Sequence, residues 1–244
     1  MGRQIIIGRS VTMTQSIRES FVVTADDYGI RQTAEPILRL AHERKIDRVA
    51  VLIHYVSAEQ AEALTATGVK IDLHLELIGL LKSGEKMHES VLVRSVNFIA
   101  RYITGLATAK KVEQEWRDQI ERFRGIFGRL PDGLNSHEHL HCFPPFFRVF
   151  IRLAAEYRIS YIRFGKKGML NGLHGAFIGK ILSFFWKRTH LIYAETALVT
   201  SDYLVSLDWL ADFRAFSTRL PQGSIELVVH LEREEDYRTI LDYF

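Results

Sequence analysis

The chain has 244 residues, of which 47% are hydrophobic and 25% are charged, and its formal net charge is +3. This composition is that of a globular protein with a full core, and a single domain of α/β barrel size accounts for the length. Because the basic residues are scattered among acidic ones rather than gathered in one run, we expect no binding of nucleic acid.

Cysteine usage and the N-terminal segment bear on location. Cys142 is the only cysteine, so a disulfide within the chain is excluded and a cytoplasmic location is expected. Residues 1–19 lack the longer apolar core of a secretory signal and are predicted to be a loosely ordered leader, with residues 20–244 as one domain. The apolar stretch 175–186 contains Lys180 and is too short to span a bilayer.

The predicted elements alternate short apolar strands with longer segments of helical period, which indicates a parallel sheet or barrel rather than a sandwich. In chain order, we expect strands at 21–25, 48–55, 70–77, 134–143, 160–164, 194–200 and 225–231. Helices are expected at 34–45, between Ser57 and Gly68, and at 93–103, 108–127, 144–157 and 207–217. Residues 78–92 are predicted to be a loop, and 168–187 form an apolar stretch punctuated by glycine.

Two adjacent acids, Asp26 and Asp27, follow the first strand. Loops after the carboxyl ends of parallel strands converge at one mouth, where active sites are built. Neighbouring side chains on a continuing strand would point to opposite faces, but Gly29 permits the chain to turn at once, so that both acids could reach one cavity. An Asp-rich turn that caps a helix is the alternative interpretation.

The segment 70–77 alternates strictly, with Asp72, His74 and Glu76 on its polar face. A lone histidine in such a place is ordinarily an interior side chain with satisfied hydrogen bonds. His74 therefore becomes a candidate ligand only in combination with the other motifs. A late strand similarly carries His230 at its carboxyl end.

A third motif contains His137, His139 and His141 at a spacing of two, which puts all three on one face of a strand. Neutral imidazoles are good ligands for zinc and similar cations, and further imidazoles can orient ligands or substrate. An accidental histidine-rich surface strand is the alternative.

The same segment matches the His-Glu-x-x-His pattern of zinc metallopeptidases through His137, Glu138 and His141. That motif functions on a helix, where residues four apart share a face. Gly133 before the motif and Pro144 after it disfavour a helix, so the peptidase hypothesis ranks second.

Four motifs occur in order between Phe21 and His230: Ala-Asp-Asp-Tyr-Gly, Asp-Leu-His-Leu, Asn-Ser-His-Glu-His-Leu-His-Cys-Phe-Pro and Glu-Leu-Val-Val-His. This ordered set resembles the YdjC-like family, which includes chitooligosaccharide and hopanoid-associated deacetylases. The resemblance implies an irregular (β/α) barrel of the α/β class, related to polysaccharide deacetylases. It also implies one divalent metal ion held by an aspartate and two histidines.

On this chain, the resemblance implies that the metal ligands are Asp27, His74 and His137. Asp26 is then the general base and His230 the general acid, whereas His139, His141 and Asn135 are expected to orient substrate or ligands. A cation such as zinc or magnesium would lower the pKa of its bound water and polarise the acetamide carbonyl. The expected activity is removal of an acetyl group from an N-acetylated amino sugar, in an oligosaccharide or a lipid-linked sugar.

The sequence departs from the usual family pattern at three positions. Asn135 stands where the family commonly has Asp, Asp72 where it has Gly, and Leu231 where it has Pro. Asn135 would replace a carboxylate contact beside the expected metal site with an uncharged one. A catalytically silent sugar-binding relative is therefore the third hypothesis.

The segment 177–188 is apolar and aromatic and ends in the basic pair Lys187 and Arg188. Such a segment could make a weak contact with a membrane surface or cover a lipid-linked sugar, although a core helix is the simpler interpretation. The sequence does not specify the oligomeric state, and a homodimer is compatible with it.

Overall fold

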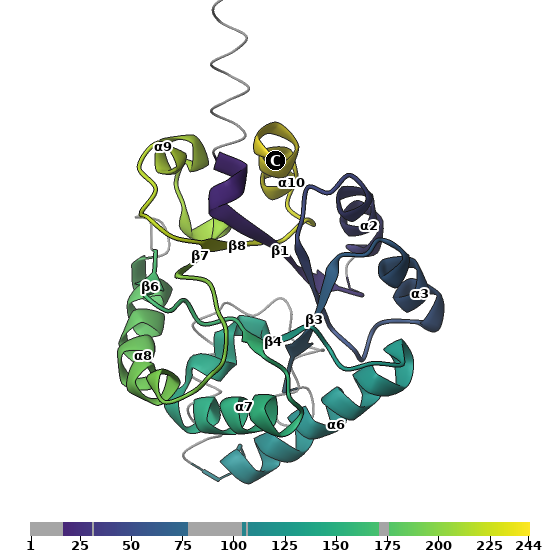
Figure 1. Ribbon diagram of the computed structural model, residues 1–244, viewed down its shortest axis with the longest axis vertical. Coiled ribbons are helices and arrows are strands. Elements are labelled where there is room, and N and C mark those ends of the chain that lie inside the picture. The colour runs from purple at the N-terminus through teal and green to yellow at the C-terminus, as the bar shows by residue number, and fades with distance from the viewer. Residues whose placement is uncertain (1–16, 31, 78–103, 106, 171–175) are drawn as a thin grey trace, which may run out of the picture.

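A computed structural model describes residues 17–30, 32–77, 104–105, 107–170 and 176–244 (Figure 1). Eight strands form one sheet in the order β5-β4-β3-β2-β1-β8-β7-β6, and each runs parallel to its neighbours. The strands are β1 (Phe21–Tyr28), β2 (Arg48–Val51), β3 (Lys70–Leu75), β4 (Gly133–Ser136), β5 (Tyr161–Ile162), β6 (Gly168–Met169), β7 (Tyr203–Ser206) and β8 (Ile225–Val229). The helices of the described ranges are α2 (Ala34–His42), α3 (Ala58–Ala66), α6 (Ala109–Phe127), α7 (Pro144–Glu156), α8 (Ala176–Ala194), α9 (Phe213–Ser217) and α10 (Glu234–Tyr243), with short 3-10 turns η2 (His137–Cys142) and η3 (Leu207–Trp209).

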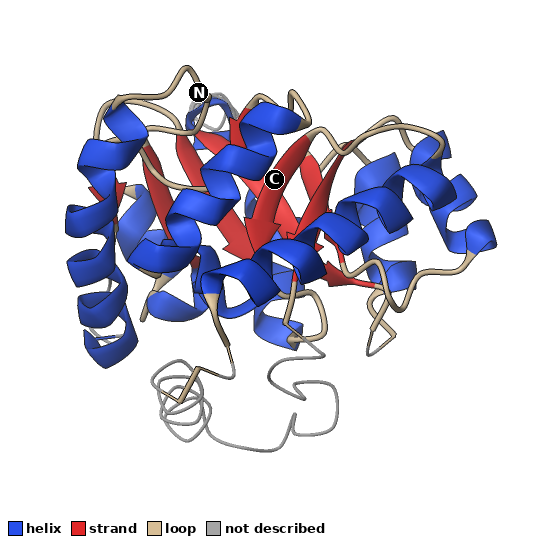
Figure 2. Ribbon diagram, turned by 90° about the horizontal axis from the view of Figure 1, so that it is seen from below, coloured by secondary structure: helices blue, strands red, loops and turns tan. Residues whose placement is uncertain are grey.

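The sheet curls until its edges approach each other. A parallel bridge joins Tyr161 in β5 to Val199, and the Ile162 N–H donates to the Val199 carbonyl (2.9 Å). Val199 lies shortly before β7, which is close to the opposite end of the strand order. Figure 1 looks into the resulting ring, and Figure 2 shows helices covering the strands from outside. The predicted α/β fold with an irregular barrel is thereby confirmed.

Local sequence signals explain several element ends. β2 is Arg-Val-Ala-Val and is buried along its whole length, as expected for a strand covered on both faces. Before α3, Ser57 and Gln60 form a capping box, in which each side chain bonds the other residue's backbone N–H. The Thr108 hydroxyl caps α6, and Gly128 ends that helix with a left-handed φ of 67°.

The hydrophobic core lies between the sheet and the surrounding helices. Trp116 of α6 is completely buried and packs edge-on against Phe146 and Phe150 of α7, with ring centroids 6.1 Å apart in both pairs. Such aromatic pairs fix the two helices against each other. Among the helices described, none combines the length and the apolar character needed to cross a bilayer.

The predicted strand at 48–55 ends already at Val51. Three further predicted elements are wrong in extent. The predicted strand at 134–143 ends at Ser136, because Glu138 and His139 adopt left-handed backbone conformations (φ 54° and 53°) and the chain forms the turn η2. The predicted strand at 194–200 is also wrong, since α8 extends to its first residue and the strand β7 forms later. The predicted helix at 207–217 is divided into η3 and α9.

Some expectations lie outside the described residues. These are the predicted loop at 78–92, the helix at 93–103 and residues 1–16 of the leader. In the remainder of the leader, Ile17 is buried and Arg18 forms an ion pair with Asp47 (2.6 Å).

Candidate metal centre

The carboxyl ends of β1, β3 and β4 bring together Asp27, His74 and His137, each of which offers one ligand atom within 4.8 Å of the others. Asp27 Oδ1 lies 3.4 Å from His74 Nε2 and 3.2 Å from His137 Nδ1. Ligands held at about 2.0–2.2 Å from a tetrahedral cation would be separated by about 3.4 Å. The three side chains therefore have the spacing and the donor types of a divalent metal site.

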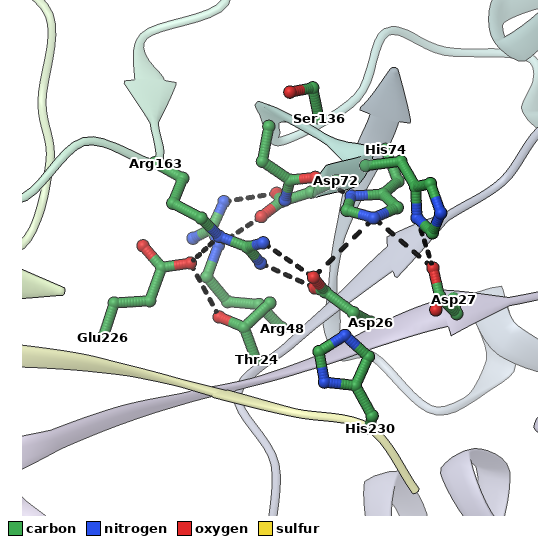
Figure 3. Close-up of polar contacts among 12 residues, drawn as sticks. Thr24, Asp26, Asp27, Arg48, Asp72, His74, Ser136, Arg163, Glu226 and His230 are labelled. Atoms are coloured by element: carbon green, nitrogen blue, oxygen red, sulfur yellow. Dashed lines mark hydrogen bonds and ion pairs between the residues drawn. The ribbon is translucent and has the colours of Figure 1, made fainter. Parts of the chain in front are cut away.

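A backbone irregularity in β1 directs both acids toward this site. The pairing of β1 with β2 shifts register between Ala25 and Tyr28, and Asp27 has a left-handed φ of 64°. Such a bulge interrupts the alternation of side chains along a strand. Asp26 and Asp27 are both buried and both approach His74 Nε2 (Figure 3). The expected convergence is present, but it arises within the strand rather than from a turn at Gly29.

His74 is oriented by its neighbour on the next strand. His74 and Asn135 are register partners of β3 and β4, and His74 Nδ1 is hydrogen-bonded to the Asn135 side-chain oxygen. Because an amide oxygen only accepts hydrogen bonds, Nδ1 carries the proton and the Nε2 lone pair is left for a cation. Asn135 therefore provides the orienting contact that a carboxylate would make, but without a negative charge.

His137 and Asp27 form an ion pair in the absence of a cation. Burial by itself lowers the pKa of His137, but the Asp27 carboxylate outweighs burial and raises this pKa to about 9. In return, despite burial, His137 and His74 hold the pKa of Asp27 well below its usual range. A bound cation would take the place of the His137 proton.

Asp26 is held by a buried arginine. Arg163 Nη1 and Nη2 each donate to one Asp26 oxygen, at 2.7 Å, and both side chains are buried. Burial alone raises the pKa of Asp26, but the Arg163 guanidinium overcomes it and brings this pKa to about 2. Asp26 is therefore ionised at any ordinary pH.

Arg163 belongs to a polar cluster that sequence reasoning missed. Its Nε donates to Glu226 (2.8 Å), which also accepts from the Thr24 and Tyr161 hydroxyls. The sequence offered one indication of this cluster, which is the single arginine within the apolar segment 160–164. Charged residues are rarely fully buried unless they are paired, so an arginine in a buried strand predicts a buried partner.

A second buried pair lies beside this cluster. Arg48 makes two hydrogen bonds to the Asp72 carboxylate and stacks on the Tyr161 ring, 3.8 Å from its centroid. Gly133 leaves room for the pair, because a Cβ there would lie 2.7 Å from Arg48 Nη2 and from Asp72 Oδ1. Asp72 therefore forms a buried ion pair with Arg48 in the interior of the barrel.

His141 is fully engaged in structural hydrogen bonds. Its Nε2 donates to the Arg163 carbonyl (2.8 Å), and its Nδ1 contacts the Ser136 hydroxyl (2.7 Å). Burial lowers the pKa of His141 to about 3, with Arg163 contributing, so the ring is neutral. Neither ring nitrogen is left for a cation or a substrate. The peptidase hypothesis requires His137 and His141 to share one face of a helix. They do not, because Glu138 and His139 between them have non-helical backbone angles.

Two other histidines border the site with ring nitrogens that have no hydrogen-bond partner in the described part of the chain. They are His139 Nδ1 and His230 Nδ1, both buried atoms. His139 lies beside Trp209, with ring centroids 5.4 Å apart. His230 follows β8, its backbone N–H donates to Asp236 (2.8 Å), and its ring points toward Asp26 in Figure 3.

The fold and the site together define an α/β barrel protein with a three-residue candidate metal centre at the carboxyl ends of its strands. Residues 20–239 match the family described as YdjC-like protein, and the chain belongs to this family. The expectation drawn from the four motifs is confirmed.

Similar proteins carry deacetylase names. A carbohydrate deacetylase of Danio rerio is 28% identical over 151 residues, covering 58% of this chain and 48% of the relative. A chitooligosaccharide deacetylase of Escherichia fergusonii is 24% identical over 158 residues, covering 62% of this chain and 61% of the relative. The chain thus spans about half the length of the curated relatives it matches.

Among solved structures, the chain is similar to an Enterococcus faecalis protein to which cellobiose-phosphate cleavage has been ascribed. The TM-score is 0.57 at 14% identity, covering 86% of this chain and 80% of the other. At this identity the likeness supports the fold alone.

Proposed function

We propose that the protein is a metal-dependent hydrolase that removes an acetyl group from an N-acetylated amino sugar. The observation that carries this proposal is the spacing of Asp27, His74 and His137, with Asp26 and His230 beside them. The deacetylase names of the relatives support the reaction class, and a metal ion with a general base and a general acid is one set of groups that hydrolyses amides.

Asp27, His74 and His137 would hold the cation, zinc or magnesium, which when bound supplies a water of lowered pKa and polarises the acetamide carbonyl. Asp26 would accept the proton of the attacking water. A carboxylate with a pKa of about 2 is a weak base, so its contribution depends on being ionised and correctly placed.

His230 would donate a proton to the departing amine. Its ring lies on the Asp26 side of the site, and its buried Nδ1 has no partner among the described residues. A general acid must present a proton at the leaving group, and an uncommitted ring nitrogen can do so. His139, which also has an uncommitted buried nitrogen, would contact the sugar.

Acetate release from a panel of N-acetylated mono- and oligosaccharides, with and without chelator, tests the proposal. We expect chelator-sensitive release that is lost in Asp26→Asn while metal binding persists. Activity that survives both chelation and this substitution would contradict the proposal. Sugar binding without acetate release would favour the catalytically silent hypothesis.

A further inference from the structure

Glu226 lies within β8 and is completely buried. Its oxygens accept hydrogen bonds from Arg163 Nε (2.8 Å), the Thr24 hydroxyl (3.1 Å) and the Tyr161 hydroxyl (2.8 Å). Three accepted hydrogen bonds are the pattern of an ionised carboxylate. In Figure 3, Glu226 lies on the opposite side of Arg163 from Asp26. The Glu226 carboxylate is thus held by side chains of β1 and β5, and it contacts the arginine that also bonds Asp26.

Neutralisation of buried charge does not account for Glu226. Arg48 already makes two hydrogen bonds to Asp72, and Arg163 already makes two to Asp26. Glu226 therefore adds a third carboxylate to a cluster with two guanidinium groups. An additional buried charge costs desolvation energy, so its presence needs another explanation.

The geometry of the guanidinium supplies that explanation. Arg163 is planar, with Nη1 and Nη2 directed at Asp26 and Nε directed at Glu226. Without the Nε contact, the end of the arginine side chain could rotate and the two-pronged alignment with the carboxylate would be lost.

We infer that Glu226 is a positioning residue that sets the orientation of the Asp26 carboxylate through Arg163. This inference rests on the proposed role of Asp26 as the base. The hydrogen bonds of Glu226 join it to Thr24, Tyr161 and Arg163 rather than to the candidate ligands, so we expect its effect to be on the placement of Asp26 and not on metal binding.

Two substitutions separate orientation from charge. Glu226→Gln keeps an oxygen that accepts from Arg163 Nε, whereas Glu226→Leu removes every acceptor. We expect Glu226→Leu to lower kcat by about ten- to a hundredfold, the range for a misplaced catalytic group, with little change in KM or metal affinity. Glu226→Gln should retain most of kcat. Equal losses in the two variants, or an unchanged kcat in a folded Glu226→Leu protein, would overturn the inference.

A double-mutant cycle tests whether the effect passes through Arg163. Arg163→Lys keeps a positive charge but cannot make the two-pronged contact. In that background, Glu226→Leu should have little further effect on kcat, and additive losses would count against the inference. Asp72→Asn is the matched control, because it alters another buried carboxylate paired with an arginine. A loss of kcat in this control as large as in Glu226→Leu would indicate general sensitivity to buried charge and overturn the inference.

Crystal structures of the parent protein and Glu226→Leu give a readout that does not depend on activity. We expect the Asp26 carboxylate of the variant to be turned so that it no longer makes both hydrogen bonds to Arg163 Nη1 and Nη2. An unchanged Asp26 would refute the positioning role. If the parent releases no acetate from any sugar, the proposed function fails, whereas the orientation of Asp26 still decides the role of Glu226.

Discussion

His74 and Asn135 face each other across the β3–β4 pair, and the imidazole Nδ1 of His74 donates to the Asn135 side-chain oxygen. This contact fixes both the tautomer and the ring orientation of a candidate ligand. In metal sites with such a contact, removing the partner commonly lowers metal affinity by about 10- to 100-fold.

Substitutions at Asn135 should therefore change metal affinity in opposite directions. Asn135→Leu, of similar size but without an acceptor, should weaken zinc binding by about 10- to 100-fold. Asn135→Asp should strengthen it, because a carboxylate makes the His74 imidazole a better donor to the cation. Competition with a chromogenic chelator measures both, and equal affinities in parent and Asn135→Leu would contradict the assigned contact.

Metal binding should depend on pH through His137, whose pKa in the metal-free protein is raised to about 9. Below that pH the cation must displace a proton, so apparent affinity should rise about tenfold per pH unit up to about pH 9 and then level off. Calorimetry in buffers of different ionisation enthalpy should show release of about one proton at pH 7. Affinity that is constant between pH 6 and 9 would contradict the His137–Asp27 ion pair.

The stability of the metal-free protein should depend on the same group with the opposite sign. Because the folded pKa of His137 lies above the unfolded value of about 6.5, its contribution to stability is complete below pH 6.5 and disappears as the pH rises through 9. Urea unfolding of the chelator-treated protein at several pH values measures this trend. His137→Gln should lose this part of the pH dependence, and a variant that retains all of it would assign the trend to another group.

The packing around Gly133 predicts a loss of stability on a minimal substitution. A Cβ at Gly133 would lie 2.7 Å from atoms of both Arg48 and Asp72, and 2.8 Å from Tyr161. We expect Gly133→Ala to lower the free energy of unfolding by about 1–3 kcal/mol, as overpacking does.

Gly125 provides the matched control for this substitution. It lies in α6, and an added Cβ would meet no atom within 4 Å. Gly125→Ala should therefore raise the free energy of unfolding by about 0.5–1 kcal/mol, because alanine favours the helix. Urea unfolding checks both variants, and a neutral Gly133→Ala would show that the buried pair can shift.

The parts of the fold that follow from local chemistry could be predicted from the sequence. The valine-rich β2, the capping box at Ser57 and the glycine that ends α6 each depend on residues adjacent in the chain. The meeting of Asp27, His74 and His137 follows from the general rule that parallel strands end at one mouth.

The remainder depends on long-range contacts that local patterns do not contain. The left-handed Asp27 follows from the register of β1 against β2, which no propensity specifies. Histidines at a spacing of two are typical of one face of a strand. Here, however, His141 lies in a turn, where its ring is hydrogen-bonded to Ser136 and to the Arg163 carbonyl. The role of Arg163 itself depends on Glu226, 63 positions away in the sequence.

Exposed side chains of α8 support the predicted membrane contact, which stays a prediction to be tested. Leu182 is buried, whereas Phe184 and Leu191 are 51% and 73% exposed, and the neighbouring Lys187 and Arg188 are exposed. Exposed apolar and basic side chains along one helix suit the surface of an anionic bilayer. We expect weak co-sedimentation with vesicles containing phosphatidylserine and none with neutral vesicles.

A charge reversal on this face tests whether the contact is specific. Arg188 lies over the Phe184 ring, 4.2 Å from its centroid, so Arg188→Glu alters both the charge and the apolar surface. This variant should reduce binding to anionic vesicles by about tenfold. Arg214→Glu, an equal change of charge at an exposed residue of α9, is the control and should have a much smaller effect. Equal losses of vesicle binding in the two variants would mean that binding depends only on the net charge of the protein. If the parent protein does not sediment with anionic vesicles, the predicted membrane contact is wrong.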